Sequence, residues 1–279
     1  MDEDGVQLNR YRESQPNMAQ IITLTTDFGL EDEYVGVMKG VILSRAPGAR
    51  IVDLTHGIKA HDVRQAAFVI HSASQYFPQG TVHAVVVDPG VGGQRKIILL
   101  TAGNQLFLAP DNGALSLVHR RDSRIYEATN DSLFLPAVSR TFNGRDIFAP
   151  LAAALANGLD PAKVGPRLAD KEITLLPLSE VQITEREVAG SVIAIDHFGN
   201  LITNIHRSAF PDDYSGDLSR FRVKIGTRLA GVRVCYEDVS EGGLLTLFGS
   251  RDYLEIAVSR GNAAMFLESS IDDEVVVTW

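Results

Sequence analysis

The chain has 279 residues, of which 45% are hydrophobic and 22% are charged, and this globular mixture excludes a wholly disordered protein. Its 35 acidic residues outnumber the 26 Lys and Arg residues, and the formal charge of −9 argues against a nucleic-acid partner, because phosphate binding requires a basic patch. The single cysteine, Cys235, excludes an internal disulfide and a cysteine-rich zinc site. No apolar run approaches the roughly 20 residues that a membrane helix needs, so no membrane association is expected.

The first 20 residues are polar and lack the apolar segment of a signal peptide, so we expect a disordered extension at 1–20. Without an export signal, and with only one thiol, the chain is expected in the cytoplasm. The ordered protein is therefore expected to begin at about residue 21.

Between residues 21 and 180, strand and helix patterns alternate along the chain. Residues 34–45 and 62–76 carry apolar side chains at helical spacing, and β-rich runs lie between them. This alternation is typical of βαβ units and predicts an N-terminal α/β sandwich domain with a mainly parallel sheet. The predicted strands are 21–26, 50–55, 81–87, 96–101, 105–109 and 125–128, and the predicted helices are 34–45, 62–76, 114–119 and 146–157.

After about residue 175 the helical periodicity ends. Residues 176–187 resemble a linker, and the remainder consists of short β-rich runs separated by turns. Such a pattern is typical of a small β-barrel, so we predict a C-terminal β-barrel domain over residues 181–279. The predicted strands are 192–195, 201–205, 221–225, 233–236, 244–248, 253–258 and 274–278.

The motifs of several common enzyme classes are absent from the sequence. It has no P-loop, no dinucleotide fingerprint after the first strand, no Gly-x-Ser-x-Gly elbow and no paired-histidine zinc helix. The spacing of Asp53, His56, His61 and Asp62 matches no standard zinc pattern. We therefore expect neither a metal nor a nucleotide cofactor.

Two carboxylates stand where predicted strands end, Asp27 after the first strand and Asp88 after the third. Ligands of open α/β sheets bind beyond the carboxyl ends of the strands, so both are candidate site residues. Residues 88–95 (DPGVGGQR) add glycines that let a ligand approach the backbone, and Arg95, which can turn back to face Asp88. The alternative is that these aspartates only cap loops and helices.

Later segments carry further candidate residues. Residues 141–146 (TFNGRD) precede a predicted helix and are equally typical of its N-terminal cap. Residues 196–200 (DHFGN) join two predicted strands and are equally typical of a plain turn. Residues 249–253 and 259–264 flank a further predicted strand of the second domain.

In their order along the chain, these segments resemble one known family, the S-adenosyl-L-methionine (SAM) hydroxide adenosyltransferases. These enzymes are adenosine-forming SAM hydrolases, and the fluorinases and chlorinases are their halide-using relatives. The resemblance implies an α/β domain followed by a small β-barrel. The segments that carry it are 26–29, 88–92, 109–113, 141–142 with 144–146, 196–200 and 250–251.

The resemblance also implies a homotrimer, with each site between the N-terminal domain of one subunit and the C-terminal domain of a neighbour. It implies that Asp27 binds the ribose hydroxyls and that Phe142 lies along the ribose and the sulfonium. A carboxylate suits vicinal hydroxyls or an ammonium, and an arginine fork suits a carboxylate. The residues implied for the methionine end are Asp32, Asp196, Ser250 and Arg251, and those for the adenine are Phe198, Asn200, Asn262 and Ala263.

In the hydrolase branch an Asp, an Arg and a His surround the attacking water. Asp88 and Arg95 match the first two, whereas Asn143 stands where the family pattern has His. An amide can hydrogen-bond to water but cannot take its proton. The expected reaction is hydrolysis of SAM to adenosine and L-methionine by displacement at the ribose C5′, with SAM as a small-molecule substrate and no cofactor.

Three alternatives remain open. A catalytically weak protein that binds SAM or adenosine fits if Asn143 marks a loss of activity. A halogenase fits less well, because an anion about 4 Å from the Asp88 carboxylate is repelled by about 1 kcal/mol in water and about 4 kcal/mol at an effective dielectric of 20. An unrelated structural or metal-binding protein would have no affinity for adenosyl ligands.

Overall fold

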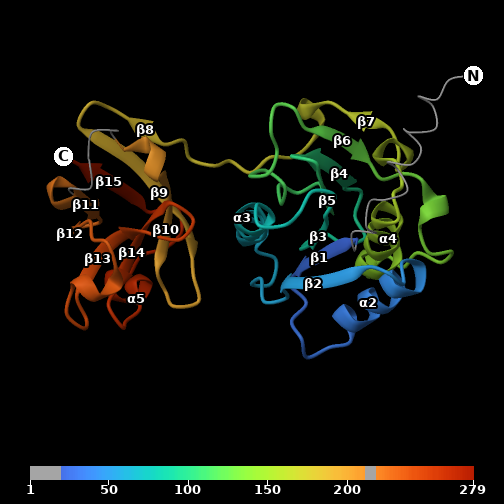
Figure 1. The fold of residues 1–279 in the computed structure, drawn as a ribbon, viewed down its shortest axis with the longest axis horizontal. Helices are drawn as coiled ribbons and strands as arrows, with labels where there is room; N and C mark the ends of the chain where they lie inside the picture. The colour runs from blue at the N-terminus through green and yellow to red at the C-terminus, as the bar shows by residue number, and fades with distance from the viewer. Residues whose placement is uncertain (1–19, 211–217) are drawn as a thin grey trace, which may run out of the picture. The chain divides into compact units, whose positions relative to one another are not determined.

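The computed structural model describes residues 20–210 and 218–279, which form two compact units (Figure 1). The first unit ends at Leu176 and the second begins at Pro177. Apart from residue 20, the extension expected at 1–20 lies outside the described residues. Within the described ranges, no helix is long and apolar enough to cross a membrane.

A seven-stranded mixed sheet forms the centre of the first unit, in the order β2-β1-β3-β5-β4-β6-β7. The strands β2, β1, β3 and β5 pair in parallel, and β5, β4, β6 and β7 pair antiparallel. The parallel half requires crossovers through helices, whereas β4 and β5 form a hairpin. The elements are β1 (Ile21–Thr26), α2 (Tyr34–Arg45), β2 (Arg50–Thr55), α3 (Val63–Ser74), β3 (Val82–Val86), β4 (Ile97–Ala102), β5 (Gln105–Pro110), β6 (Arg124–Glu127), α4 (Ala149–Ala156) and β7 (Arg167–Leu168).

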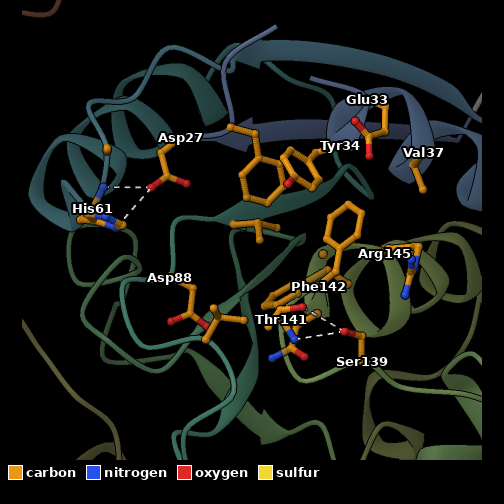
Figure 2. Close-up of a pocket in the computed structure, with 17 residues that line it drawn as sticks. Asp27, Glu33, Tyr34, Val37, His61, Asp88, Ser139, Thr141, Phe142 and Arg145 are labelled. Atoms are coloured by element: carbon orange, nitrogen blue, oxygen red, sulfur yellow. Dashed lines mark hydrogen bonds and ion pairs between the residues drawn. The ribbon is translucent and has the colours of Figure 1, made fainter. Parts of the chain in front are cut away.

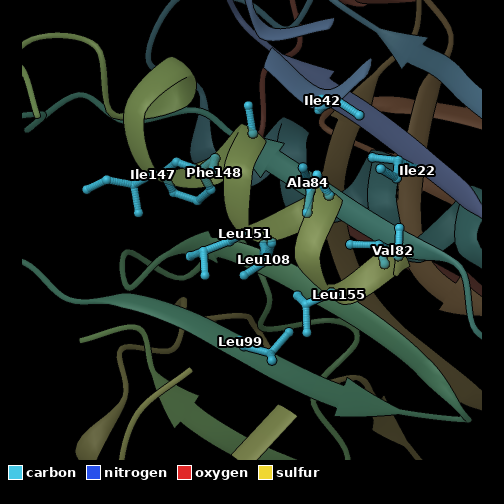
Figure 3. Packing of buried hydrophobic residues seen from close by; sticks show 14 of the residues in the cluster. Ile22, Ile42, Val82, Ala84, Leu99, Leu108, Ile147, Phe148, Leu151 and Leu155 are labelled. Carbon is cyan, nitrogen blue, oxygen red and sulfur yellow. The ribbon is translucent and has the colours of Figure 1, made fainter. Parts of the chain in front are cut away.

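Helices cover both faces of this sheet. The helices α2 and α4 pack on one face and α3 packs on the other (Figure 1). Along β3, Ala84 and Val86 point to the hydrophobic core on the side of α2 and α4. Val85 points to the core on the side of α3, as the two-residue period of a strand requires. Figure 3 shows Leu151 and Leu155 of α4 among the sheet residues that they cover. Burial on both faces explains why β3 is a nearly continuous apolar run.

Two predicted helices of the first unit differ from the structure. Residues 114–119 form a turn, in which the Ser116 hydroxyl donates to the Gly113 carbonyl at 2.7 Å. The helix predicted at 146–157 begins instead as a π-helical turn, η2 (Gly144–Phe148), and continues as α4. Pro150 has no N–H to donate to the Asp146 carbonyl, which accepts the Leu135 N–H instead at 2.9 Å.

The second unit is an antiparallel sheet that curls into a nearly closed barrel, in the order β12-β11-β15-β9-β10-β14-β13 with β8 beside β9. The two edges meet at an isolated bridge between Val232 and Thr246. The two units confirm the predicted fold class, an α/β domain followed by a small β-barrel. The sheet of the first unit is mixed, with three parallel and three antiparallel pairings, where a mainly parallel sheet was predicted. The elements are β8 (Gln182–Ile183), β9 (Glu187–Ile195), β10 (Leu201–His206), β11 (Arg222–Ile225), β12 (Arg228–Gly231), β13 (Leu244–Phe248), β14 (Tyr253–Val258), α5 (Ala263–Leu267) and β15 (Glu274–Thr278).

The strand predicted at 233–236 is wrong. The strand that pairs with β11 is β12, which ends at Gly231. The Asp238 carboxylate accepts the backbone N–H groups of Val234 at 2.9 Å and Cys235 at 3.1 Å. These bonds compete with strand pairing and fold residues 236–238 into the 3-10 turn η8 (Tyr236–Asp238).

Candidate active site

A cavity of about 560 Å³ opens at the carboxyl ends of two neighbouring parallel strands (Figure 2). Asp27 follows β1 and Asp88 follows β3, and both line the cavity. Phe142 and Asn143, which precede η2, line another part of its wall. The fold therefore brings together four candidates from three separate segments of the chain.

Asp88 is a buried carboxylate with two partners. Its Oδ1 accepts the Gly90 N–H at 3.1 Å and lies 2.9 Å from Nη2 of Arg95, whose side chain is 24% exposed against 8% for Asp88. Burial raises the pKa of Asp88, and the charge of Asp27 adds to this, while Arg95 and the Gly90 N–H act in the opposite direction. A Cβ at position 90 would lie 1.6 Å from Arg95 Nη2, so a larger residue there would displace the guanidinium from Asp88.

Asp27 is oriented by the loop that precedes α3. The His61 N–H donates to Asp27 Oδ2 at 2.9 Å, and the His61 Nδ1 lies 4.0 Å from the same oxygen (Figure 2). His61 adopts a left-handed φ of 70°, and its exposed imidazole lines the cavity. Both contacts use Oδ2, so Oδ1 is available to a ligand.

The buried side chain and the backbone of His56 hold the turn that carries Asp27. The His56 Nδ1 lies 2.8 Å from the Thr26 hydroxyl, and the His56 carbonyl accepts the Gly29 N–H at 2.9 Å. These two contacts hold the residues on either side of Asp27 and Phe28. They fix the backbone that places the Asp27 carboxylate at the cavity wall.

Three aromatic rings form an apolar wall of the cavity. The Phe142 ring centroid lies 5.1 Å from that of Tyr34 and 6.1 Å from that of Phe28, both in edge-on geometry. Tyr34 and Phe28 are themselves 5.8 Å apart. The guanidinium of Arg145 lies 5.2 Å from the Phe142 centroid. The wall therefore offers ring faces and edges to a ligand with apolar or cationic character.

Asp146 holds the loop before η2 in place and lines none of the described cavities. It is fully buried, and it accepts bonds from Arg145 Nε at 2.6 Å, Arg145 Nη2 at 3.0 Å and the Ser139 N–H at 2.7 Å. Burial opposes its charge, but these bonds hold the pKa of Asp146 below its ordinary value. Neither Asp146 nor Asn143 is a side-chain cap, which was the alternative for this segment.

A second cavity, of about 320 Å³, adjoins the Asp88–Arg95 pair. Arg95 lines it, together with the neighbouring Lys96 and Arg140. Asn143 and Ser139 line both this cavity and the larger one. Asn143 therefore stands at the boundary between the substrate-sized cavity and a smaller polar one.

The barrel unit has its own cavity, of about 670 Å³. Five predicted site residues line it: Asp196, Phe198, Asn200, Ser250 and Arg251. The Asp196 Oδ1 accepts the N–H groups of Phe198 and Asn200, each at 2.9 Å, and its Oδ2 accepts Asn200 Nδ2 at 3.0 Å. This tight turn leaves the Phe198 side chain 72% exposed, as a flat apolar surface at the cavity.

Asn262 and Ala264, at the start of α5, support this turn. The Asn262 Oδ1 accepts the Met265 N–H at 2.8 Å, and the Ala264 N–H donates to the Gly199 carbonyl at 3.0 Å. A Cβ at Gly199, where φ is 85°, would lie 2.1 Å from Asn262 Cγ. The close approach of these two segments therefore depends on glycine at position 199.

Two protein-family models match this chain, one in each of its two units. Residues 22–165 match the SAM hydroxide adenosyltransferase N-terminal domain, and residues 190–276 match the C-terminal domain. The chain belongs to this family. The motif order noted in the sequence is therefore confirmed as a family relationship.

Named relatives in this family include hydrolases and halide-using enzymes. The chain is 38% identical to the (R)-S-adenosyl-L-methionine hydrolase of Thermus thermophilus, over 85% of this chain and 91% of that protein. It is 37% identical to the protein of the same name from Salinispora arenicola, over 92% of this chain and 97% of that protein. It is 30% identical to the fluorinase of Nocardia brasiliensis, over 88% and 92%. A solved structure of an uncharacterized conserved protein from Thermotoga maritima superposes with a TM-score of 0.83 at 39% identity, covering 92% of this chain and all (100%) of that one.

Within this member of the adenosyltransferase family, three predicted residues stand apart and several site residues were not predicted. Asp32 is exposed, and Asp32, Asn262 and Ala263 line none of the three cavities described here. In the part of the chain that is described, no group of three or more His, Cys, Asp or Glu residues is arranged to hold a metal ion. The cavity-lining residues that sequence reasoning missed include Phe28, Tyr34, His61, Tyr236 and Glu255.

Proposed function

We propose that this chain hydrolyses SAM to adenosine and L-methionine. The observation that carries the proposal is the buried Asp88 carboxylate, held by Arg95 at 2.9 Å, in a cavity that also presents Asp27 and Phe142. The relatives named (R)-S-adenosyl-L-methionine hydrolase, at 37–38% identity over most of the chain, support the same reaction.

The reaction is an in-line displacement at the ribose C5′. The oxygen of a water molecule forms a bond to C5′ while the C5′–S bond breaks. The electron pair of the C5′–S bond stays on the sulfur, which neutralises the sulfonium and gives the thioether of methionine. Asp88 orients the water and takes its proton, which then passes to solvent. The raised pKa of Asp88 makes it a better proton acceptor than an ordinary carboxylate. Holding the water in line with the C5′–S bond supplies much of the rate enhancement.

Arg95 and Asn143 support Asp88 in this mechanism. Arg95 keeps the carboxylate oriented and ionised. Asn143, at the boundary of the two cavities, offers a hydrogen bond to the water but cannot accept its proton. The leaving thioether is neutral, so no metal ion is needed to stabilise it.

Different parts of the SAM molecule are bound by residues of the two kinds of cavity. In the first unit, Asp27 binds the ribose hydroxyls through its available oxygen, and Phe142 lies along the ribose and the sulfonium. In the barrel unit, the exposed ring of Phe198 gives the adenine a stacking surface. The residues assigned to the methionine end are Asp32, Asp196, Ser250 and Arg251, and those assigned to the adenine with Phe198 are Asn200, Asn262 and Ala263.

Each unit carries only part of this binding set, so one complete site needs a cavity of each kind. We propose a homotrimer in which the first unit of one subunit meets the barrel unit of a neighbour. The exposed Phe198 ring and the open cavity around it support this, because both are surfaces that an assembled site would cover.

The deciding experiment is incubation of the purified protein with SAM, with and without chloride, followed by chromatography and mass spectrometry of the products. We expect adenosine and methionine with the wild type. We expect Asp88→Ala to bind SAM with unchanged affinity by calorimetry and to lose at least about a hundredfold in turnover, because no group remains to orient the water. Formation of 5′-chloroadenosine would make the protein a halogenase. Intact SAM, bound by the wild type, would make it a binding protein.

A further inference from the structure

Glu255 is a buried carboxylate in the wall of the barrel cavity. It is 5% exposed and belongs to β14, whose other residues are mostly apolar (YLEIAV). The Tyr236 hydroxyl donates to Glu255 Oε2 at 3.1 Å, and Arg251 Nη2 lies 3.7 Å from Glu255 Oε1. Both oxygens therefore face groups of the protein, and one of those groups is the arginine of the cavity.

The chain makes room for this carboxylate at Gly249. A Cβ on residue 249 would lie 1.9 Å from Glu255 Oε1 and 2.3 Å from its carboxyl carbon. The Gly249 N–H donates to the Tyr253 carbonyl at 3.0 Å, and the Asp252 N–H donates to the Gly249 carbonyl at 3.0 Å. The turn between β13 and β14 is thus closed around a site that only glycine leaves open.

The Tyr236 hydroxyl is held in place and stays protonated. The bonds from Val234 and Cys235 to Asp238 fix the turn η8, on which Tyr236 stands. Burial, with the charge of Glu255, raises the pKa of Tyr236 to about 12. The phenol is therefore a hydrogen-bond donor to Glu255 throughout the physiological pH range.

We propose that Glu255 is the positioning residue of Arg251, holding its guanidinium at the angle at which it donates hydrogen bonds to the carboxylate at the amino-acid end of the substrate. The proposal rests on the proposed function, in which Arg251 binds that carboxylate. An arginine fork binds a carboxylate through two parallel bonds, and its long side chain has many conformations from which one must be selected. Glu255, fixed by Tyr236 and with space left by Gly249, selects that conformation through its contact with Arg251 Nη2.

Three variants remove this function in different ways. Glu255→Gln keeps the shape and the bond to Tyr236 but removes the charge that attracts Arg251. Tyr236→Phe removes the bond that fixes the carboxylate. Gly249→Ala leaves every charge in place and displaces the end of the Glu255 side chain, a flexible group whose movement costs the fold little. Glu237→Gln, an exposed position on the same turn as Tyr236, is the matched control.

The measurement is the dissociation constant, by calorimetry, for three ligands: SAM, decarboxylated SAM and adenosine. We expect the wild type and Glu237→Gln to bind SAM more tightly than decarboxylated SAM. In the three test variants, affinity for SAM should fall about tenfold, since a charged hydrogen bond is mispositioned. Affinity for the other two ligands should stay the same, and KM for SAM should rise while kcat is unchanged.

Each contrary result has a distinct meaning. Equal weakening of all three ligands, or unchanged selectivity for the carboxylate in Glu255→Gln and Gly249→Ala, overturns the role of Glu255. A wild-type protein that binds no SAM overturns the proposed function itself. Thermal unfolding of each variant separates these results from loss of the fold, and Gly249→Ala keeps the test decisive if Glu255→Gln does not fold.

Discussion

At Asp88, burial and the positive charge of Arg95 shift the pKa of the same carboxylate in opposite directions. Burial and the charge of Asp27 raise its pKa, while Arg95 and the Gly90 N–H lower it. Asp88 must be ionised to take a proton, so activity should rise with pH through its pKa and fall when the carboxylate is protonated. Because Arg95 opposes this upward shift in pKa, it extends the active range of the enzyme toward lower pH.

The Arg95→Gln variant tests this relation. Removing the positive charge raises the pKa of Asp88 further, so the acidic limb of kcat/KM should move to higher pH, and the plateau should fall about tenfold because the carboxylate loses its orienting partner. The measurement is the rate profile between about pH 4 and pH 9. Arg121→Gln, at an exposed position that lines none of the described cavities, is the control. An acidic limb that stays in place would show that Arg95 does not act on Asp88.

The Asn143→His variant tests whether the amide limits the rate. An imidazole with a pKa near neutrality can accept the proton that an amide cannot, so kcat should rise about tenfold near pH 8, with KM for SAM little changed. Asn143→Gln retains the amide and should not raise the rate. If His and Asn support equal rates, the proton leaves through Asp88 alone.

Among single residues, the sequence was informative where function coincides with a local pattern. Asp27 and Asp88 were found because strand ends can be located from the sequence, and parallel strands bring such ends together. His61 and Glu255 were missed because their partners are distant in sequence: His61 bonds to Asp27 from 34 positions away, and Tyr236 reaches Glu255 across 19. A charged residue in the apolar strand 253–258 was the one local signal for Glu255.

At the level of elements, periodicity predicted most strands and the two long helices, and it failed where a side chain or a missing donor redirected the backbone. The helix predicted at 114–119 is only one and a half turns long and closes as a turn instead. The strand predicted at 233–236 is folded by the Asp238 carboxylate. The start of the helix at residue 146 is altered by Pro150 and by a partner at Leu135. In the last two segments the cause includes a hydrogen bond that apolar patterning does not encode.

The loop from Asp88 to Arg95 depends on Gly92, which allows a testable substitution. Gly92 has a φ of 81°, and a Cβ there would lie 2.5 Å from the carbonyl oxygen of Arg140. Gly92→Ala should lower the free energy of unfolding by about 1–3 kcal/mol and reduce kcat more than it raises KM, because the loop carries Arg95. Gly48→Ala is the control, since nothing lies within 4 Å of a Cβ at that position. Equal effects of the two substitutions on kcat would contradict this dependence.

For the whole molecule, assembly determines whether the two kinds of cavity can act together. We expect light scattering after size-exclusion chromatography to give three times the 30.3-kDa mass of one chain. A sharper test is to co-express Asp88→Ala with Arg251→Ala. If sites form between subunits, a mixed trimer contains some sites with both residues intact. At SAM concentrations well below KM, about a quarter of wild-type activity or less should then return, although each variant alone has little activity there. No recovery in verified mixed oligomers would place both residues of a site in one chain.

The position of β15 in the barrel has a consequence for how the chain folds during synthesis. This strand, near the end of the chain, is a central strand, paired with β9 on one side and β11 on the other. Until the ribosome has passed residue 274, β9 and the β11–β12 hairpin each present an unpaired edge, which is a template for aggregation. The first unit has no such dependence on late residues, because its strands end at Leu168. Nascent chains halted between the two units should therefore contain a folded α/β domain, while chains halted just before β15 should be the ones that need a chaperone.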